Sequence, residues 1–383
     1  MSNDSVLIML QFGTNVGYAI APLETTFYNM ARKLGFANEN IHFSYKETVK
    51  GKPESLPDSF SNVIAFDPRS EDQQRIKDLA KYISENHIKY VFGFDLPAKR
   101  PFYKPIREVG VKRIVSYYGA PMSSINRGLK LLLKKIEMKL NSLGPDHYIF
   151  ESNAMRDTAI LGRGVASEKT SVVPLGVDVE KYDVNVHDGI DIHQEFDIPK
   201  DRKTIFYSGH MQKRKGVHIL VDAVAELCNS RNRQDIHLLI FGNKPGEIDW
   251  LEERFKGSAA ENYITFGGYR SDLNQIMPQC YLGAIASNGW DSFPRSAIEM
   301  QACGLPLLVS RFQGLVETIE ENKTGLLFTP GDAHDLADKI EKMCDNEDLR
   351  AQLSTNARKR VEAGYTLKVQ LENISSVVKN QFQ

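Results

Sequence analysis

Short runs of apolar residues alternate with amphipathic helical segments along most of this chain. The runs over 5–12, 203–208 and 281–286 contain few charged side chains, which is typical of parallel strands that are buried on both faces. The segment 22–34 follows the first run and repeats apolar residues at helical spacing. Because strands and helices alternate, the pattern predicts an α/β fold in which helices cover both faces of parallel sheets.

The length of the chain indicates two domains. A chain of 383 residues is too long for one ordinary hydrophobic core. The segment 183–203 is polar and lacks a strong hydrophobic period, so we expect the linker there. We predict an N-terminal domain over 1–185 and a C-terminal domain over 186–366, each built on a doubly wound parallel sheet.

Composition and charge disfavour several classes of protein. The formal net charge is −1, so no basic excess favours nucleic acid as a partner. The four cysteines lie far apart without metal-ligand spacing, which favours reduced thiols in a cytoplasmic protein. No stretch reaches the roughly 20 apolar residues of a membrane-spanning helix. Residues 1–11 predict a first strand, not a signal peptide.

Two acidic residues lie eight positions apart in a predicted strand–helix–strand unit. Asp291 follows the apolar run 281–286, and Glu299 lies inside a helix that is predicted to begin near Pro294 and to end at Gly304. Open α/β sheets bind ligands in the crevice outside the carboxyl ends of their strands. The carboxylates are therefore candidates for a binding site, although the spacing also fits an ordinary βαβ unit.

The segment around these carboxylates resembles a known family. Residues 291–306, D-S-F-P-R-S-A-I-E-M-Q-A-C-G-L-P, resemble the E-x7-E segment of retaining GT-B glycosyltransferases of family 4, the glycosyl transferases group 1. Residues 172–178, V-V-P-L-G-V-D, and 323–332, K-T-G-L-L-F-T-P-G-D, are similar to two further motifs of that family. The resemblance implies two Rossmann-like domains that face each other across a cleft. It also implies that the last helix, over 367–383, packs back on the N-terminal domain.

The resemblance assigns a catalytic or binding role to three side chains. Asp291 takes the position of the acidic residue that faces the donor sugar, although it is one methylene shorter than the usual Glu. Glu299 takes the position that holds the ribose hydroxyls of the nucleotide. Residues 209–216 resemble the motif G-R-x4-K-G, in which Arg and Lys clamp the donor diphosphate, and Lys215 matches that Lys.

The chain departs from the family pattern at two positions. His210 stands where the diphosphate motif has Arg, and Lys213 and Arg214 are candidates to supply the charge that His carries only when protonated. Tyr118 stands where relatives often have an acceptor-side His. A Tyr can hydrogen-bond or stack on a sugar, but it is a poor proton acceptor near neutral pH.

Further candidates lie in loops that follow predicted strands. The glycine-bearing loop 13–17 can bring backbone N–H groups close to a phosphate, and so can the starts of the helices near 293–295 and 314. In the resembled family, the loop that corresponds to 267–270 carries the base of the nucleotide. The candidate donor-binding residues are Gly13, Gly17, Gly209, His210, Arg214, Tyr269, Arg270, Phe293, Pro294, Arg295, Gly314 and Leu315.

The resemblance implies a retaining glycosyltransferase that moves a sugar from a nucleotide-diphosphate sugar to a hydroxyl acceptor. The expected acceptor is a sugar or a lipid-linked sugar in cell-surface polysaccharide or glycolipid synthesis. No D-x-D motif stands out, so we expect no metal cofactor and charge neutralisation by protein cations. Alternatives on the same fold are a catalytically weak partner subunit, a sugar phosphorylase or a nucleotide-sugar epimerase. A plain sugar-binding or nucleotide-binding protein is a further alternative.

A basic amphipathic helix is predicted over 123–142. Its apolar residues form one stripe, and five basic side chains occupy the remainder: Arg127, Lys130, Lys134, Lys135 and Lys139. Such a helix can lie on anionic lipid, which would place the protein peripherally at the inner face of the membrane. The alternative is a helix whose apolar stripe packs on the core while its basic face is solvated.

Overall fold

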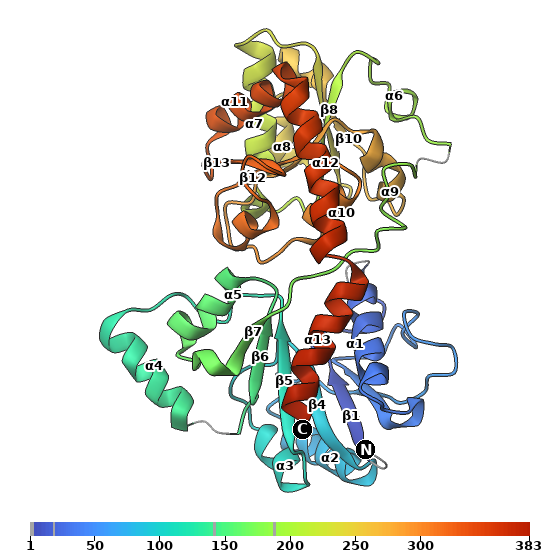
Figure 1. Cartoon of the computed structure of the whole chain (residues 1–383), viewed down its shortest axis with the longest axis vertical. Helices are drawn as coiled ribbons and strands as arrows, with labels where there is room; N and C mark the ends of the chain where they lie inside the picture. The colour runs from blue at the N-terminus through green and yellow to red at the C-terminus, as the bar shows by residue number, and fades with distance from the viewer. Residues whose placement is uncertain (1–3, 18–19, 141–142, 187–188) are drawn as a thin grey trace. The chain divides into compact units, whose positions relative to one another are not determined.

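The computed structural model describes residues 4–17, 20–140, 143–186 and 189–383. The chain divides into two compact units (Figure 1). The N-terminal unit comprises Met1–Pro174 and Leu367–Gln383, and the C-terminal unit comprises Leu175–Thr366. The boundary that we predicted at 185 therefore lies inside the C-terminal unit. Residues 187 and 188 of the predicted linker, and 141 and 142 of the predicted basic helix, lie outside the described residues.

The N-terminal unit is built on a seven-stranded parallel sheet in the order β3-β2-β1-β4-β5-β6-β7. Its strands are β1 (Ser5–Met9), β2 (Ile41–Tyr45), β3 (Val63–Ala65), β4 (Ile88–Phe94), β5 (Arg113–Tyr118), β6 (His147–Phe150) and β7 (Thr170–Val172). Its helices are α1 (Ala21–Lys33), α2 (Gln73–Glu85), α3 (Tyr103–Glu108), α4 (Gly128–Leu140), α5 (Asn153–Asp157) and the C-terminal helix α13 (Leu367–Phe382).

Aromatic side chains join α1 and α13 to the sheet of this unit. The ring of Phe27 in α1 lies 4.9 Å from that of Phe92 and 5.7 Å from that of Tyr117, in edge-to-face arrangements. Phe382 in α13 stacks on Tyr90 of β4 at 4.5 Å. The last helix of the chain therefore packs on the first unit, and burial of apolar surface holds it there.

The C-terminal unit is built on a six-stranded parallel sheet in the order β10-β9-β8-β11-β12-β13. Its strands are β8 (Lys203–Ser208), β9 (Ile236–Phe241), β10 (Ile264–Phe266), β11 (Leu282–Ile285), β12 (Leu307–Ser310) and β13 (Gly325–Phe328). Its α-helices are α6 (Ile192–Glu195), α7 (Val217–Asn229), α8 (Asp249–Glu252), α9 (Leu273–Ile276), α10 (Arg295–Ala302), α11 (Ala333–Asp345) and α12 (Glu347–Gly364).

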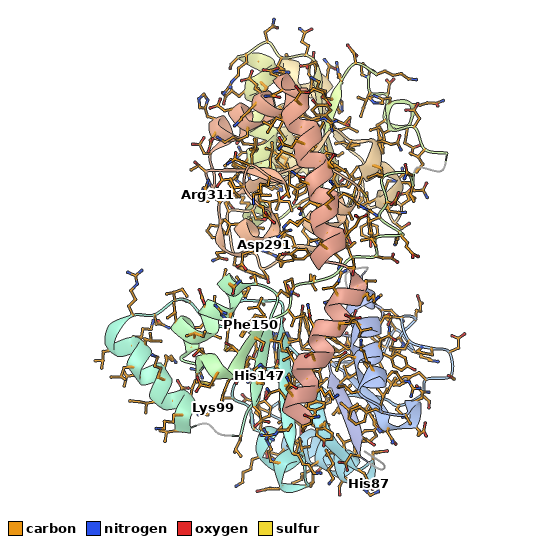
Figure 2. The ribbon with its side chains drawn as sticks, in the orientation of Figure 1. His87, Lys99, His147, Phe150, Asp291 and Arg311 are labelled. Atoms are coloured by element: carbon orange, nitrogen blue, oxygen red, sulfur yellow. The ribbon has the colours of Figure 1, made fainter. Side chains whose placement is uncertain are left out.

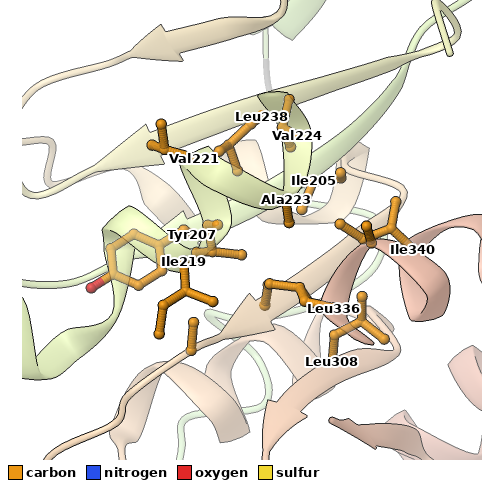
Figure 3. Close-up of a cluster of buried hydrophobic side chains, with 14 of the residues drawn as sticks. Ile205, Tyr207, Ile219, Val221, Ala223, Val224, Leu238, Leu308, Leu336 and Ile340 are labelled. Atoms are coloured by element: carbon orange, nitrogen blue, oxygen red, sulfur yellow. The ribbon is translucent and has the colours of Figure 1, made fainter. Parts of the chain in front are cut away.

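Side chains of the central strands alternate between two hydrophobic cores. In β8, Ile205 and Tyr207 belong to the core that α7 and α11 cover, with Leu336 and Ile340 (Figure 3). Phe206, between them, belongs to a second core on the opposite face. Successive side chains of a strand point to opposite faces, so a strand that is covered on both faces must be apolar throughout. This explains why the sequence showed apolar runs and not an alternating pattern.

Each sheet has one place where the order of its strands reverses. In the N-terminal unit it lies between β1 and β4, and in the C-terminal unit between β8 and β11. The loops that leave the carboxyl ends of two such strands diverge, and a crevice for ligands forms between them. In the C-terminal unit these loops are 209–216 and 286–294, which hold several of the predicted donor-binding residues.

Across the described ranges, no helix is both long and apolar enough to cross a membrane.

We expect Phe382→Ala to lower the free energy of unfolding by about 3 kcal/mol, because it leaves a cavity beside Tyr90. Asn380→Ala removes an exposed side chain of the same helix and should change stability by less than about 0.5 kcal/mol. Urea denaturation of both variants checks this. Equal stabilities would show that α13 contributes little to the N-terminal unit.

Candidate functional site

Lys215 and Asp291 meet at the strand reversal of the C-terminal sheet. The Nζ atom of Lys215 lies 2.7 Å from Oδ2 of Asp291, and the Oγ atom of Ser287 donates to the same oxygen at 2.8 Å. The side chain of Asp291 is 7% exposed and that of Lys215 is 19% exposed. Asp291 is labelled in Figure 2. An ammonium group and a carboxylate, both largely removed from water, therefore lie together where parallel sheets bind ligands.

Gly216 fixes the backbone that follows Lys215. The 3-10 helix η4 (Lys213–Lys215) ends at Gly216, whose φ of 71° is in the left-handed region. A Cβ atom at this position would lie 1.8 Å from the carbonyl oxygen of Ala286, at the end of β11. Only glycine satisfies both the left-handed backbone and this close approach. The same residue is the N-cap of α7, so one backbone position orients Lys215 against the loop of Asp291.

Arg214 connects its own loop, 209–216, to the loop 286–294 that carries Asp291. Its carbonyl oxygen accepts hydrogen bonds from the backbone N–H groups of Asn288 at 2.9 Å and Gly289 at 3.1 Å. Its guanidinium donates to the carbonyl of Trp290 at 3.1 Å and lies 4.3 Å from the centre of the Trp290 ring. Arg214 therefore positions the loop that carries Asp291, and its positive charge lies beside a half-exposed indole ring.

Glu299 is buried inside α10. Burial raises the pKa of its carboxyl group, while the charge of Arg295 and a side-chain hydrogen bond with Tyr182 lower it. Arg295 also donates to the carbonyl of Gly176 at 3.0 Å. The carboxylate of Glu299 thus has protein partners in this structure, and a ribose would join or replace Tyr182.

The predicted residues at the start of α10 have different surroundings. Pro294 is the N-cap, and no side chain caps the first N–H groups of the helix. These groups are candidates to bind an anion. The side chain of Phe293 is buried and stacks on Tyr365 with ring centres 5.5 Å apart. Its ring therefore anchors the loop and leaves any ligand contact to the backbone.

Ser287 and Gln313 contact Asp291, and neither was predicted from the sequence. The Oε1 atom of Gln313 accepts from the backbone N–H of Asp291 at 3.3 Å. Gln313 has a φ of 42°, a left-handed conformation that is uncommon for residues other than glycine. Ser287 had a signal in the sequence, because it directly follows the strand that ends before Asp291.

Gly314 and Leu315 are buried in the 3-10 helix η7 (Gln313–Thr318). The backbone N–H of Leu315 donates to the carbonyl of Phe312 at 3.0 Å. The backbone N–H of Leu315 is therefore already hydrogen-bonded within the turn. It could contact a phosphate, as predicted, only if the turn opened.

Gly209 and His210 follow β8 directly. The backbone N–H of Gly209 donates to the carbonyl of Phe241 at 3.1 Å, and the carbonyl of His210 accepts from the hydroxyl of Tyr207 at 3.2 Å. The side chain of His210 is exposed. The loop is therefore held by its backbone, while the imidazole that replaces the usual Arg lies in solvent.

Tyr269 and Arg270 follow β10. Tyr269 is 59% exposed, so its ring is available to a ligand. The guanidinium of Arg270 lies 2.6 Å from oxygens of both Asp272 and Glu195, and these partners raise its pKa above the usual range. Arg270 is thus already neutralised by two carboxylates, whereas Tyr269 fits the role predicted for this loop.

Three further predicted residues lie in the N-terminal unit. Gly17 borders a cavity of about 240 Å³ with Asn15, Glu24 and Ser55, and Gly13 lies against the side chain of Glu47. The hydroxyl of Tyr118 donates to the carbonyl of Leu96, and burial raises its pKa well above the usual range. The Tyr118 ring packs among buried aromatic residues, so an acceptor would not reach its hydroxyl in this conformation.

No group of three or more His, Cys, Asp or Glu side chains is arranged to hold a metal ion within the described parts of the chain. Lys215 forms the ion pair with Asp291, and the guanidinium of Arg214 lies over the ring of the preceding residue, Trp290.

The sequence matches a family model and several curated proteins over part of its length. The model of the glycosyl transferases group 1 matches residues 189–360. A D-inositol 3-phosphate glycosyltransferase of Corynebacterium kroppenstedtii is 26% identical over 219 residues, which cover 55% of this chain and 48% of that protein. The capsular polysaccharide biosynthesis glycosyltransferase CapM of Staphylococcus aureus is 24% identical over 232 residues, which cover 60% of this chain and 58% of that protein. The chain thus spans about half the length of the curated relatives it matches.

Solved structures resemble the chain over its whole length. A glycosyltransferase from Rickettsia africae superimposes with a TM-score of 0.80 at 18% identity, covering 100% of this chain and 99% of that one. Anabaena HepE, solved in complex with UDP, superimposes with a TM-score of 0.78 at 19% identity, and the match covers 98% of this chain and 100% of that one. The predicted class of two Rossmann-like, doubly wound parallel-sheet domains is confirmed, and at these identities the likeness concerns the fold alone.

We expect Gly216→Ala to lower the free energy of unfolding by about 2–5 kcal/mol. An alanine in the left-handed region costs about 1–2 kcal/mol, and relieving the clash with Ala286 costs about 1–3 kcal/mol more. Gly257→Ala is the matched control, because Gly257 also has a positive φ, of 75°, but nothing lies within 4 Å of an added Cβ. Denaturation curves that coincide for the two variants would contradict the proposed role of the Ala286 contact.

Proposed function

The model of the glycosyl transferases group 1 matches residues 189–360, and on this premise we propose that the chain is a retaining glycosyltransferase of that family. It would move a sugar from a nucleotide-diphosphate sugar to a hydroxyl acceptor. The observation that carries the proposal is the contact of Lys215 with Asp291 at the strand reversal of the unit that the family model covers. Two alternatives, a sugar phosphorylase and a nucleotide-sugar epimerase, would use the same phosphate-binding loops.

The bond from the sugar to the diphosphate breaks more easily when the charge that grows on the leaving group is neutralised. Lys215 would supply that charge, helped by Arg214 and by the uncapped N–H groups at the start of α10. In this structure the ammonium group of Lys215 donates a hydrogen bond to the carboxylate of Asp291. On donor binding, the ammonium would turn to the diphosphate, and Asp291 would accept hydrogen bonds from sugar hydroxyls.

Glu299 would hold the ribose. Its carboxylate forms a side-chain hydrogen bond with Tyr182 and lies within the field of the positive charge of Arg295. Tyr269, exposed after β10, would contact the base. In this scheme the protein positions the donor and stabilises charge, and it forms no covalent bond to the sugar.

The names of two similar proteins suggest a class of acceptor. CapM acts in capsular polysaccharide biosynthesis, and another similar structure is that of a lipopolysaccharide outer core galactosyltransferase, WaaB. By analogy, we place the acceptor among cell-surface polysaccharides or glycolipids, with the enzyme on the cytoplasmic side and in peripheral contact with the membrane.

A catalytically weak partner subunit is the second candidate. The observation that favours it is the exposed His210, which stands where the diphosphate motif has an arginine. Such a protein would bind a nucleotide without releasing nucleotide diphosphate from any sugar donor.

We expect Lys215→Ala to lower the rate of nucleotide-diphosphate release from the preferred donor by roughly 100- to 1,000-fold, because one preorganised charge is lost from the leaving group. The assay incubates a panel of UDP-, GDP- and ADP-sugars with the protein and measures free nucleotide diphosphate. Lys359→Ala, which removes an exposed lysine of α12, should turn over like the wild type. Full activity in Lys215→Ala would refute the assigned role, and binding without turnover by the wild type would favour the partner subunit.

We expect Glu299→Gln to weaken nucleotide binding by roughly 10- to 100-fold, the usual value of a hydrogen bond to a charged group. Isothermal titration calorimetry with UDP and GDP measures the change. The exposed Glu253 provides the control variant Glu253→Gln, which should bind as tightly as the wild type. If Glu299→Gln kept wild-type affinity while its melting temperature was unchanged, Glu299 would not be the ribose ligand.

A further inference from the structure

Helix α4 turns its apolar face away from the domain to which it belongs. The side chains of Leu129, Leu132, Leu133, Ile136 and Leu140 are 72%, 52%, 58%, 48% and 80% exposed. They recur at intervals of three and four residues, so they lie on one stripe of the helix. Figure 1 shows α4 at the outer side of the N-terminal unit, beyond α5 and the edge strand β7. The expectation that this stripe packs on the core is therefore wrong.

The opposite face of α4 holds the helix on the protein. Glu137 forms a bidentate ion pair with Arg163, in which each carboxylate oxygen lies 2.9 Å from a guanidinium nitrogen. Met138 packs against the buried cluster that contains Tyr118 and Tyr148. A Cβ atom on Gly164 would lie 2.5 Å from the backbone nitrogen of Lys135, so the two backbones touch. An ion pair and a backbone contact therefore fix the orientation of α4, while its apolar side chains remain exposed.

The charges around the exposed stripe have one sign. Residues 127–140 contain five basic side chains and one acidic side chain, a net charge of +4, whereas the whole chain has a net charge of −1. The acidic residue is Glu137, which faces Arg163. Lys130 lies along one edge of the stripe and Lys135 and Lys139 along the other, all three exposed. The surface therefore presents leucine side chains between rows of ammonium groups.

A second copy of the chain does not fit this surface. Pairing two such stripes would bring lysines of both copies together, and like charges across an interface are unfavourable. A bilayer that contains anionic lipids fits both features, because acyl chains accept the leucines and phosphate groups accept the lysines.

We propose that α4 docks the protein in the plane of an anionic bilayer surface, with Leu129, Leu133 and Ile136 inserted and the flanking lysines on lipid phosphates. The proposal concerns a surface of the N-terminal unit that contains no predicted donor residue. It deepens the proposed function by placing the enzyme where a lipid-linked acceptor is found.

The test measures binding of the full chain to phosphatidylcholine vesicles with and without phosphatidylglycerol, by flotation. The wild type should bind only the vesicles that contain phosphatidylglycerol, and less as salt is raised. The triple variant Leu129→Asn/Leu133→Asn/Ile136→Asn should lose binding by at least about tenfold. Lys130→Gln and Lys139→Gln should each weaken it roughly fivefold.

Val49→Asn removes an apolar side chain that is 81% exposed outside α4, and it should bind vesicles like the wild type. Lys215→Ala should also bind normally even though we expect it to be inactive, so loss of activity and loss of docking can be distinguished. Circular dichroism melting of the triple variant should match the wild type, because its side chains are exposed. Vesicle binding by the triple variant, no binding by the wild type, or a wild-type dimer in solution that the triple variant abolishes would each overturn the proposal.

Discussion

The ion pair of Lys215 with Asp291 joins two loops that leave the sheet on either side of its strand reversal. Both groups are largely removed from water, and this desolvation opposes their attraction, so such a pair adds little to stability by itself. The proposed function gives both charges a role, because they would contact the donor. The geometry around it is set by rigid elements: the left-handed Gly216 against Ala286, the Arg214 carbonyl that accepts two amides, and Ser287 on the shared carboxylate oxygen.

Three consecutive basic residues, Lys213 to Lys215, precede α7, whose N-terminus is itself the positive end of the helix dipole. Cations placed there repel the dipole, and the arrangement is more favourable when an anion is shared between them. Arg214 offsets part of this cost by stacking on Trp290, and Lys215 by pairing with Asp291. Under the proposed function, a phosphate of the donor would replace the carboxylate of Asp291 on the ammonium group of Lys215.

In the N-terminal unit, the aromatic core and the exposed face of α4 lie on different sides of that helix. Tyr118 is buried and bonded to Leu96, so it supports the aromatic core beside α5. The same core receives Met138 of α4 and leaves the leucines of that helix outside. An amphipathic helix usually buries its apolar stripe, and here the ion pair of Glu137 with Arg163 orients it the other way. That reversal underlies the proposed contact with lipid.

The sequence by itself determined the alternation of strands and helices and the number of sheets, because buried strands and amphipathic helices leave distinct hydrophobic periods in the chain. The resemblance of its motifs to those of a known family also pointed to Lys215 and Asp291. Only the tertiary structure decided that these two are in contact, that Ser287 and Gln313 support them, and that Arg270 is already paired with Asp272 and Glu195. It likewise decided which way α4 faces, since a helical stripe has the same sequence pattern whether it is buried or exposed. Such features depend on residues far apart in the chain, and a linear pattern carries no information about which partner occupies each polar group.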